Sequence, residues 1–230
     1  MAISNDKSLK LRAYVVKTLV SGALEILSTT WTDRLSPSFR DERRDLDKLA
    51  EKLTGEEASG YPDDYLTDDY VVIEQTQQIM VALYAVAIYH VFEQHMVYSF
   101  YRWAKHCLGQ KPAGKPQLND VVDSFKVAWS VDLRTLRSWP KIDELRLVAN
   151  CVKHGEGDSC DRLREIQPTW FKNRDHGVIP LGAFGVEIPA EDLEQAIGAV
   201  KDFLAELETT LTGGRSADGS SLESNYEISI

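Results

Sequence analysis

The chain has 230 residues, of which 43% are hydrophobic, so it can form a packed core and is not expected to be disordered. Its formal net charge of −10 argues against a protein that coats nucleic acid non-specifically. Its three cysteines are too few for a disulfide framework or a structural zinc site. We therefore expect reduced thiols and a cytoplasmic protein without a signal peptide.

Apolar residues recur at helical spacing over Asp6–Leu35 and predict a first long helix. The segment SPSF, residues 36–39, is predicted to break this helix. A charged helix follows and ends at Thr54, with opposite charges placed to pair along its exposed face. In the next loop, Asp68 or Asp69 is expected to cap the helix that follows. A divalent cation is an alternative ligand for the four aspartates of this loop: Asp63, Asp64, Asp68 and Asp69.

The strongest helical signal covers Tyr70–Leu108, a stretch without glycine or proline. As one helix it would be about 58 Å long at 1.5 Å per residue, which leaves room for a kink or break. Its uncharged apolar run, Ile79–Phe92, has fourteen residues, whereas a membrane span needs about 20. We therefore expect a buried helix or one at a subunit interface, and no membrane association.

Shorter helices are predicted in the second half of the chain: over residues 118–129, within the segment SWPKIDELRLVANCVKHG (138–155), in a short stretch that ends at Ile166, and over residues 192–211. Pro140 lies near the first turn of the second of these, where proline is tolerated. Asp158 or Ser159 is expected to cap the third, and Pro168 is expected to stop it.

One segment resembles a strand more than a helix, GVIPLGAFGVEIP, and predicts a small extended or hairpin insertion near residues 176–189. Residues 213–230 are rich in glycine and serine and predict a flexible tail. The sequence thus predicts an all-α fold, a bundle of long helices that forms one domain over residues 1–212.

Polar residues form a narrow stripe on the predicted helix within residues 138–155. At 100° per residue, Arg146, Asn150, Lys153 and His154 fall within an arc of about 100°. The opposite arc is apolar and is expected to face the core, with Leu145, Val148, Ala149 and Val152.

The residue types in this stripe suit a phosphodiester. Histidine can transfer a proton near neutral pH, and arginine can bind phosphate through two parallel hydrogen bonds. Asn150 can orient the imidazole or hold a ribose hydroxyl, and in RNA the 2′-hydroxyl is a built-in nucleophile that needs no metal. A structural interpretation stays open, because Lys153 and His154 followed by Gly155 are also typical of a helix C-terminus.

The segment LRLVANCVKHGEG, in a chain of long helices, resembles the HEPN superfamily of helical-bundle domains. Many members are dimeric, metal-independent endoribonucleases of toxin–antitoxin, CRISPR and phage-defence systems. Their signature is an arginine, often followed by a polar residue, and a histidine a few residues later in the same helix. Asn150 and His154 match this pattern, whereas the nearest arginine is Arg146, with seven residues between it and His154.

The resemblance covers about residues 70–211 and implies a homodimeric endoribonuclease without metal or cofactor, acting as a toxin or phage-defence effector. Its implied partners are RNA and a cognate antitoxin or partner protein. The alternatives are a catalytically inactive HEPN-like interaction or regulatory protein, and a nucleotide-binding or nucleotide-transferring protein. The residues assigned to catalysis are Arg146, Asn150 and His154, and those assigned to RNA binding are Lys153, Arg137 and Lys141.

Other candidate sites have simpler structural interpretations. Arg102 and His106 share a helix face and resemble a shortened form of the same motif. His90 and His95 lie about 140° apart on a helix, which is a poor arrangement for a metal and favours core histidines. Between Lys126 and Arg174, ten Lys/Arg outnumber seven Asp/Glu and form a predicted basic region. Four aromatic residues of this region would stack on bases or pack in the core: Trp129, Trp139, Trp170 and Phe171.

Overall fold

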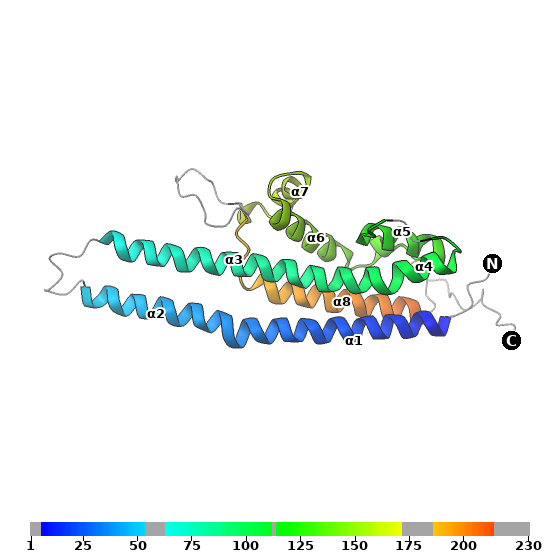
Figure 1. Ribbon diagram of the computed structural model, residues 1–230, viewed down its shortest axis with the longest axis horizontal. Helices are drawn as coiled ribbons and strands as arrows, with labels where there is room; N and C mark the ends of the chain where they lie inside the picture. The colour runs from blue at the N-terminus through cyan, green and yellow to red at the C-terminus, as the bar shows by residue number, and fades with distance from the viewer. Residues whose placement is uncertain (1–5, 54–62, 112–113, 172–185, 214–230) are drawn as a thin grey trace. The chain divides into compact units, whose positions relative to one another are not determined.

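The computed structural model describes residues 6–53, 63–111, 114–171 and 186–213, and the elements assigned there are helical, without a strand. The predicted all-α fold is confirmed. Figure 1 shows the helices in chain order. They are α1 (Asp6–Thr30), α2 (Ser36–Leu53), α3 (Asp63–Met96), α4 (Arg102–Cys107), α5 (Leu118–Trp129), α6 (Trp139–His154), α7 (Asp158–Ile166) and α8 (Asp192–Gly213). Short 3-10 helices span Leu133–Thr135 and Pro168–Trp170, and π-helical turns span Trp31–Leu35 and Val97–Tyr101.

Contacts between residues divide the chain into two compact units. The first takes its described residues from Met1–Leu24, Ala87–Arg146 and Gln195–Ile230, and the second from Glu25–Val86 and Leu147–Glu194. The boundaries between the units fall inside helices α1, α3, α6 and α8. Each unit therefore combines segments that are distant in the sequence.

An aromatic core holds the first unit together. Phe203 of α8 makes an edge-to-face contact with Phe92 of α3, with ring centroids 5.4 Å apart. Phe100, in the π-helical turn after α3, packs on Phe125 of α5 at 5.0 Å. These four rings are fully buried, and burying one phenylalanine stabilises a fold by about 1.5–3 kcal/mol. Helices α3, α5 and α8 are thus joined by apolar contacts.

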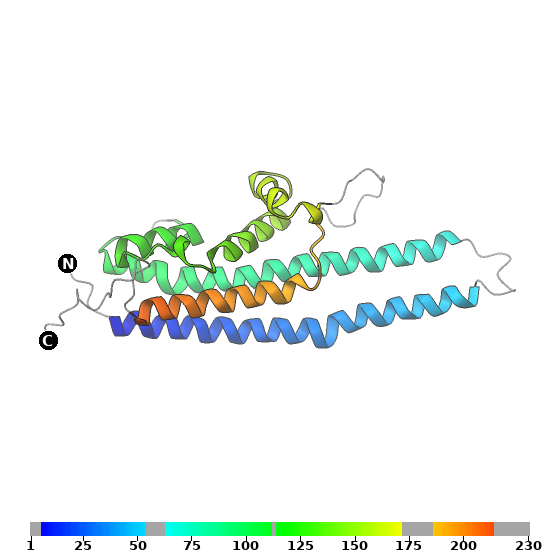
Figure 2. The same ribbon diagram turned by 180° about the vertical axis from the view of Figure 1, so that it is seen from behind.

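In the second unit, α2 and the first half of α3 form an antiparallel helical hairpin. Near its closed end, Tyr70 donates a hydrogen bond of 2.6 Å to the Asp47 carboxylate. Further along, the rings of Trp31 and Tyr84 lie 5.4 Å apart. The two helices run side by side in both views (Figure 1, Figure 2). This order of contacts, early residues of one helix against late residues of the other, defines the antiparallel arrangement.

The predicted helix break at residues 36–39 is wrong, because the helical path continues through a π-helical turn. There the Ser36 N–H donates to the Trp31 carbonyl, five residues back. Pro37 then lies in the first turn of α2, where its missing N–H is tolerated. A second π-helical turn, Val97–Tyr101, lies between α3 and α4 in the long apolar segment. Such turns widen a helix by one residue without ending it.

Several predicted helix boundaries also need correction. Helix α3 begins at Asp63, so Asp68 and Asp69 lie inside it and do not cap it. The residue that precedes α7 is Gly157, which makes no side-chain cap, and Asp158 already belongs to the first helical turn. The helix end before Pro168 is confirmed, since α7 ends at Ile166.

Two predicted segments fall mostly outside the described residues. The insertion expected near 176–189 is described only at residues 186–189, which form no strand. There the Glu187 N–H donates to the Trp170 carbonyl at 2.8 Å. The tail expected over 213–230 is described only at Gly213, the last residue of α8.

One helical stretch among the described residues, Thr67–His106, is long and apolar enough to cross a membrane by length and composition. Core helices of soluble proteins pass the same test, so this finding carries little weight by itself. Only 22% of the stretch's apolar 18-residue window is buried inside the protein, although Ile88, Phe92 and Met96 of the same stretch are fully buried.

Candidate functional site

The N-terminus of helix α6 is fixed by a carboxylate from another helix. Glu206 of α8 accepts hydrogen bonds from the backbone N–H groups of Arg137 (2.8 Å) and Ser138 (2.9 Å). It also accepts one from the Ser138 hydroxyl at 2.5 Å. Partial burial raises the pKa of Glu206, but the hydrogen bonds from Ser138 and Arg137 outweigh it, and the pKa is lowered. Glu206 thus fixes the two residues that precede α6 through hydrogen bonds from a distant part of the chain.

The apolar face of α6 lies where the sequence predicts it. The four residues assigned to that face, Leu145, Val148, Ala149 and Val152, are buried, with exposed fractions of 4% or less. Leu147 and Cys151 are fully buried as well. The face of α6 that remains accessible to a ligand is therefore narrow.

The three residues assigned to catalysis follow one row along this narrow face. They are spaced four apart, so they stack on successive turns of the helix. Accessibility increases along the row: Arg146 and Asn150 are half-buried and His154 is exposed. At 1.5 Å per residue, Arg146 lies about 12 Å from His154 along the helix axis.

Arg146 is already engaged in an ion pair. Its Nε and Nη2 atoms both donate to Asp143 Oδ1, at 2.8 and 2.7 Å. The Arg146 side chain is only 18% exposed. Asp143 was not among the predicted site residues, although a carboxylate three residues before an arginine in a helix is a recognisable signal for such a pair. The positive charge of Arg146 is thus largely compensated within its own helix.

Arg146 also interacts electrostatically with the buried Tyr89, which is hydrogen-bonded to a carboxylate. Tyr89 is 2% exposed, and its hydroxyl donates to Glu93 Oε1 at 3.0 Å. Burial raises the pKa of Tyr89, Glu93 and Asp143 raise it further, and Arg146 opposes the shift. Arg146 therefore shares its electrostatic environment with two carboxylates, which lowers its capacity to attract a phosphate.

At its C-terminus, α6 ends in a glycine loop, as its sequence indicates. Gly155 adopts a left-handed conformation with φ of 71°, and its N–H donates to the Cys151 carbonyl at 2.8 Å. Lys153 and His154 occupy the last helical turn and are exposed. Both cations therefore lie at the negative end of the helix dipole.

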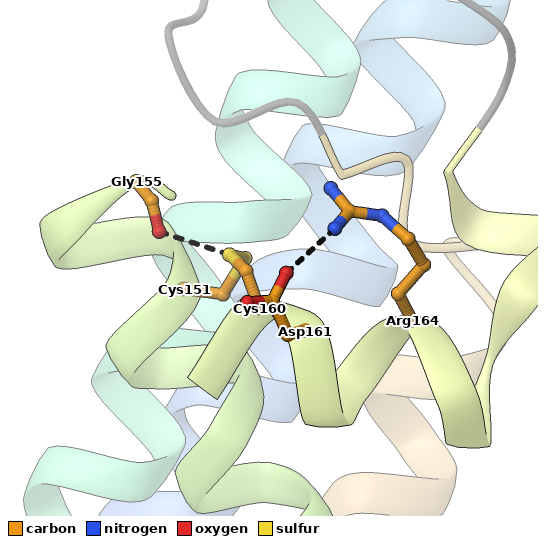
Figure 3. The surroundings of a disulfide bond; sticks show 5 residues. All are labelled: Cys151, Gly155, Cys160, Asp161 and Arg164. Atoms are coloured by element: carbon orange, nitrogen blue, oxygen red, sulfur yellow. Dashed lines mark hydrogen bonds and ion pairs between the residues drawn. A yellow bond between two sulfur atoms is a disulfide. The ribbon is translucent and has the colours of Figure 1, made fainter. Parts of the chain in front are cut away.

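A disulfide bond joins the end of α6 to the start of α7. It links Cys151 and Cys160, whose Cα atoms are 4.9 Å apart (Figure 3). The expectation of reduced thiols is wrong for this pair. The physical reason is local: the turn at Gly155 and Gly157 reverses the chain between two helices and brings their facing cysteines together. Two cysteines on either side of a glycine loop are the signal that was missed.

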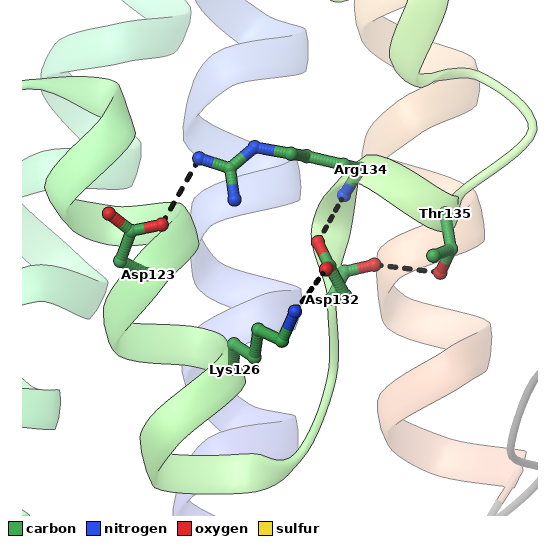
Figure 4. A network of polar contacts seen from close by, with 5 residues as sticks. All are labelled: Asp123, Lys126, Asp132, Arg134 and Thr135. Carbon is green, nitrogen blue, oxygen red and sulfur yellow. Dashed lines mark hydrogen bonds and ion pairs between the residues drawn. The ribbon is translucent and has the colours of Figure 1, made fainter.

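Several described cations of the region Lys126–Arg174 have carboxylate partners. The Lys126 ammonium pairs with Asp132 at 3.0 Å, and Arg134 pairs with Asp123 at 3.1 Å (Figure 4). The ammonium group of Lys126, with the Arg134 N–H, lowers the pKa of Asp132. Further pairs are Lys141–Glu144 at 3.0 Å and Arg164–Asp161 at 2.9 Å. The positive charges of these four cations are therefore compensated by nearby carboxylates.

The residues assigned to RNA binding do not gather around His154. Lys141 precedes it by thirteen residues, about 20 Å along the helix, and Arg137 lies before α6 begins. Arg137 is exposed and lies beside Glu206. Of the three residues, Lys153 alone adjoins His154.

The other candidate sites have structural partners. Trp129 and Trp170 are buried at 8% exposure, and Trp139 packs on Phe203 with centroids 6.1 Å apart. The Phe171 ring lies under the Arg164 guanidinium at 4.7 Å. Among the described residues, no group of three or more His, Cys, Asp or Glu residues is placed to hold a metal ion.

Comparison with known proteins adds no relative: no family model, no curated protein and no solved structure matches this chain.

Proposed function

We propose that the exposed end of helix α6 binds single-stranded RNA and that His154 takes part in metal-independent cleavage. The observation that carries this proposal is the row of Arg146, Asn150 and His154 on the narrow accessible face of α6, with the opposite face buried. A cation, an amide and an imidazole at the spacing of successive turns suit a strand that runs along the helix. His154 is the most accessible of the three and lies in the last turn.

The proposed chemistry uses the RNA itself as nucleophile. The ribose 2′-oxygen attacks the adjacent phosphorus, and the bond from phosphorus to the 5′-oxygen breaks. The products are a 2′,3′-cyclic phosphate and a free 5′-hydroxyl. His154 transfers one of the two protons, either from the 2′-hydroxyl or to the leaving 5′-oxygen. A second copy of the chain would supply the other proton transfer, in line with the homodimer that the HEPN resemblance implies.

The separation along α6 assigns different phosphates to the cationic side chains. Arg146, about 12 Å from His154, would bind a neighbouring phosphate and position the strand. Lys153, next to His154, would stabilise the negative charge that develops during cleavage. Asn150 lies between them and would bind a ribose hydroxyl. This arrangement explains why Arg146 need not have the usual spacing from His154.

The direct test is cleavage of a labelled single-stranded RNA in the presence of EDTA. The wild-type protein should produce fragments with cyclic phosphate ends, and His154→Ala should lower the rate at least about 100-fold. His90→Ala is the matched control, because His90 is an exposed histidine in another helix, and it should cleave normally. Cleavage that persists in His154→Ala would exclude His154 from the reaction.

A second candidate function is favoured by the Arg146–Asp143 pair, which compensates the one arginine on the row. In this case the chain is a catalytically inactive, HEPN-like interaction or regulatory protein. Folded protein would then neither cleave RNA nor bind it at low salt, where phosphate contacts are strongest. Tight binding of RNA that weakens steeply with salt would refute this alternative.

A further inference from the structure

We propose that Cys151 and Cys160 form a reversible thiol–disulfide exchange site that takes low-molecular-weight thiols and disulfides of the glutathione class. Its oxidation state would control the attachment of α7 to the end of α6. The inference concerns this pair alone and holds whether or not the protein cleaves RNA. The inference follows from the position of the cysteine pair, the small buried surface of α7 and the surroundings of the Cys160 sulfur.

The pair lies at the junction that holds α7 in place. Cys151 is in the last turns of α6 and Cys160 is in the first turn of α7. The link closes a loop with a sequence separation of nine, and that loop contains His154 and two glycines with positive φ, Gly155 and Gly157. Oxidation therefore restrains the only segment that joins the two helices.

Among the described residues, helix α7 buries few of its own side chains, and its Arg164 guanidinium lies over the Phe171 ring just beyond the helix. The helix is nine residues long, and its buried residues are Cys160 and Leu163. Its Arg164–Asp161 ion pair is internal to the helix and exposed. A helix that buries so little apolar surface can open locally at a modest cost in free energy. Local opening gives a small thiol access to the sulfurs, which are buried in the closed form, with exposed fractions of 0% for Cys151 and 3% for Cys160.

The reduced form also has a partner in place for one of its thiols. Cys160 Sγ lies 2.9 Å from the Gly155 carbonyl oxygen (Figure 3). In the disulfide this sulfur has no proton and cannot donate a hydrogen bond. After reduction the Cys160 thiol gains a proton and can donate it to that carbonyl, which lies just beyond the end of α6. Both oxidation states can thus close the loop, the oxidised one covalently and the reduced one through a hydrogen bond.

The exchange balances with two molecules of a monothiol. One thiolate attacks a sulfur of the pair, the bond between Cys151 and Cys160 breaks, and a mixed disulfide forms. A second thiolate attacks the mixed disulfide and releases the small disulfide. In total, the protein gains two thiols and two molecules of glutathione are oxidised to one glutathione disulfide. The reverse sequence restores the link.

The test uses the full chain with Cys107→Ser, so that the pair is the only source of thiols. The protein is equilibrated with mixtures of reduced and oxidised glutathione, quenched by alkylation and weighed by mass spectrometry. Hydrogen exchange is then measured in both forms. We expect a reversible transition within these mixtures, and faster exchange in residues 155–166 after reduction. For a loop of about ten residues the increase can reach about 100-fold, which corresponds to about 2.7 kcal/mol.

One control variant and two possible results test whether the cysteine pair is a reversible exchange site. Cys151→Ser in the same background should show the fast exchange of the reduced form at every glutathione ratio, with an unchanged far-UV circular dichroism spectrum. A pair that stays oxidised in reduced glutathione until the whole protein unfolds would refute the proposal. Equal exchange of residues 155–166 in the two oxidation states of the folded parent would also refute it, even if Cys151→Ser fails to fold.

Discussion

Replacing Glu206 should destabilise the protein through the start of helix α6. The carboxylate accepts two backbone hydrogen bonds, from Arg137 and Ser138, and one from the Ser138 hydroxyl. A hydrogen bond to a charged acceptor contributes about 1.5–3 kcal/mol. Because Glu206 is only partly buried, solvent screening and hydration of the freed N–H groups reduce the loss. For Glu206→Ala we expect about 1.5–2 kcal/mol.

The measurement is thermal unfolding followed by circular dichroism. For a chain of this size, 1 kcal/mol shifts the melting temperature by about 2–4 °C, so Glu206→Ala should melt about 3–8 °C below the wild type. Glu206→Gln keeps an acceptor oxygen and loses the charge, so it should fall between the two. The matched control is Glu208→Gln on the same helix. Its ion pair with Lys17 is partly exposed, and such pairs contribute about 1 kcal/mol or less.

The same substitution predicts a pH dependence. The pKa of Glu206 is lower in the folded protein than its ordinary value. Its contribution to stability is therefore fully present above the unfolded pKa, and it is lost as the pH falls through the folded pKa. The difference in melting temperature between wild type and Glu206→Gln should be largest near neutral pH and should shrink below about pH 4. Two results would refute the role of Glu206 in holding the start of α6. One is a difference in melting temperature between wild type and Glu206→Gln that stays constant with pH, and the other is an unchanged melting temperature in Glu206→Ala.

Two further substitutions test the site and the core. Asp143→Asn removes the carboxylate that pairs with Arg146 and should tighten RNA binding about fivefold, equal to about 1 kcal/mol, with a steeper salt dependence in fluorescence anisotropy. Weaker binding in this variant would mean that Asp143 holds Arg146 in its binding position. Phe203→Ala removes a fully buried ring that contacts Phe92 and Trp139 and should cost about 3–5 kcal/mol in urea unfolding. Val127→Ala, at a side chain 69% exposed, should cost less than about 0.5 kcal/mol.

The fold class followed from the sequence because hydrophobic periodicity depends on short-range geometry. The buried arc of α6, for example, is confirmed at Leu145, Val148, Ala149 and Val152. The interruptions were less predictable. Ser36–Pro37 has the composition of a break, yet a π-helical turn absorbs it. Whether a chain ends a helix or widens it depends on hydrogen bonds five residues apart and on tertiary contacts, which composition does not encode.

The candidate site was predictable in its placement and not in its electrostatics. The row of Arg146, Asn150 and His154 follows from the helical repeat alone. The pairing of Arg146 with Asp143 depends on the rotamers of the two side chains. The interaction of Arg146 with Tyr89 depends on how α3 packs against α6 in the first unit. Glu206 reaches Ser138 across 68 residues of sequence, and such a contact has no local signature. The assignment of catalysis to the row remains a prediction.

The π-helical turn at Trp31–Leu35 implies that helix length at this point matters more than residue type. Each residue turns a helix by about 100°, so deleting one residue here would rotate all side chains of α2 by that angle relative to α1. Asp47 would then point away from Tyr70, although the composition of the helix would hardly change. Substitutions at the exposed residues of this turn, Asp33 and Arg34, should be tolerated much better than any single-residue insertion or deletion.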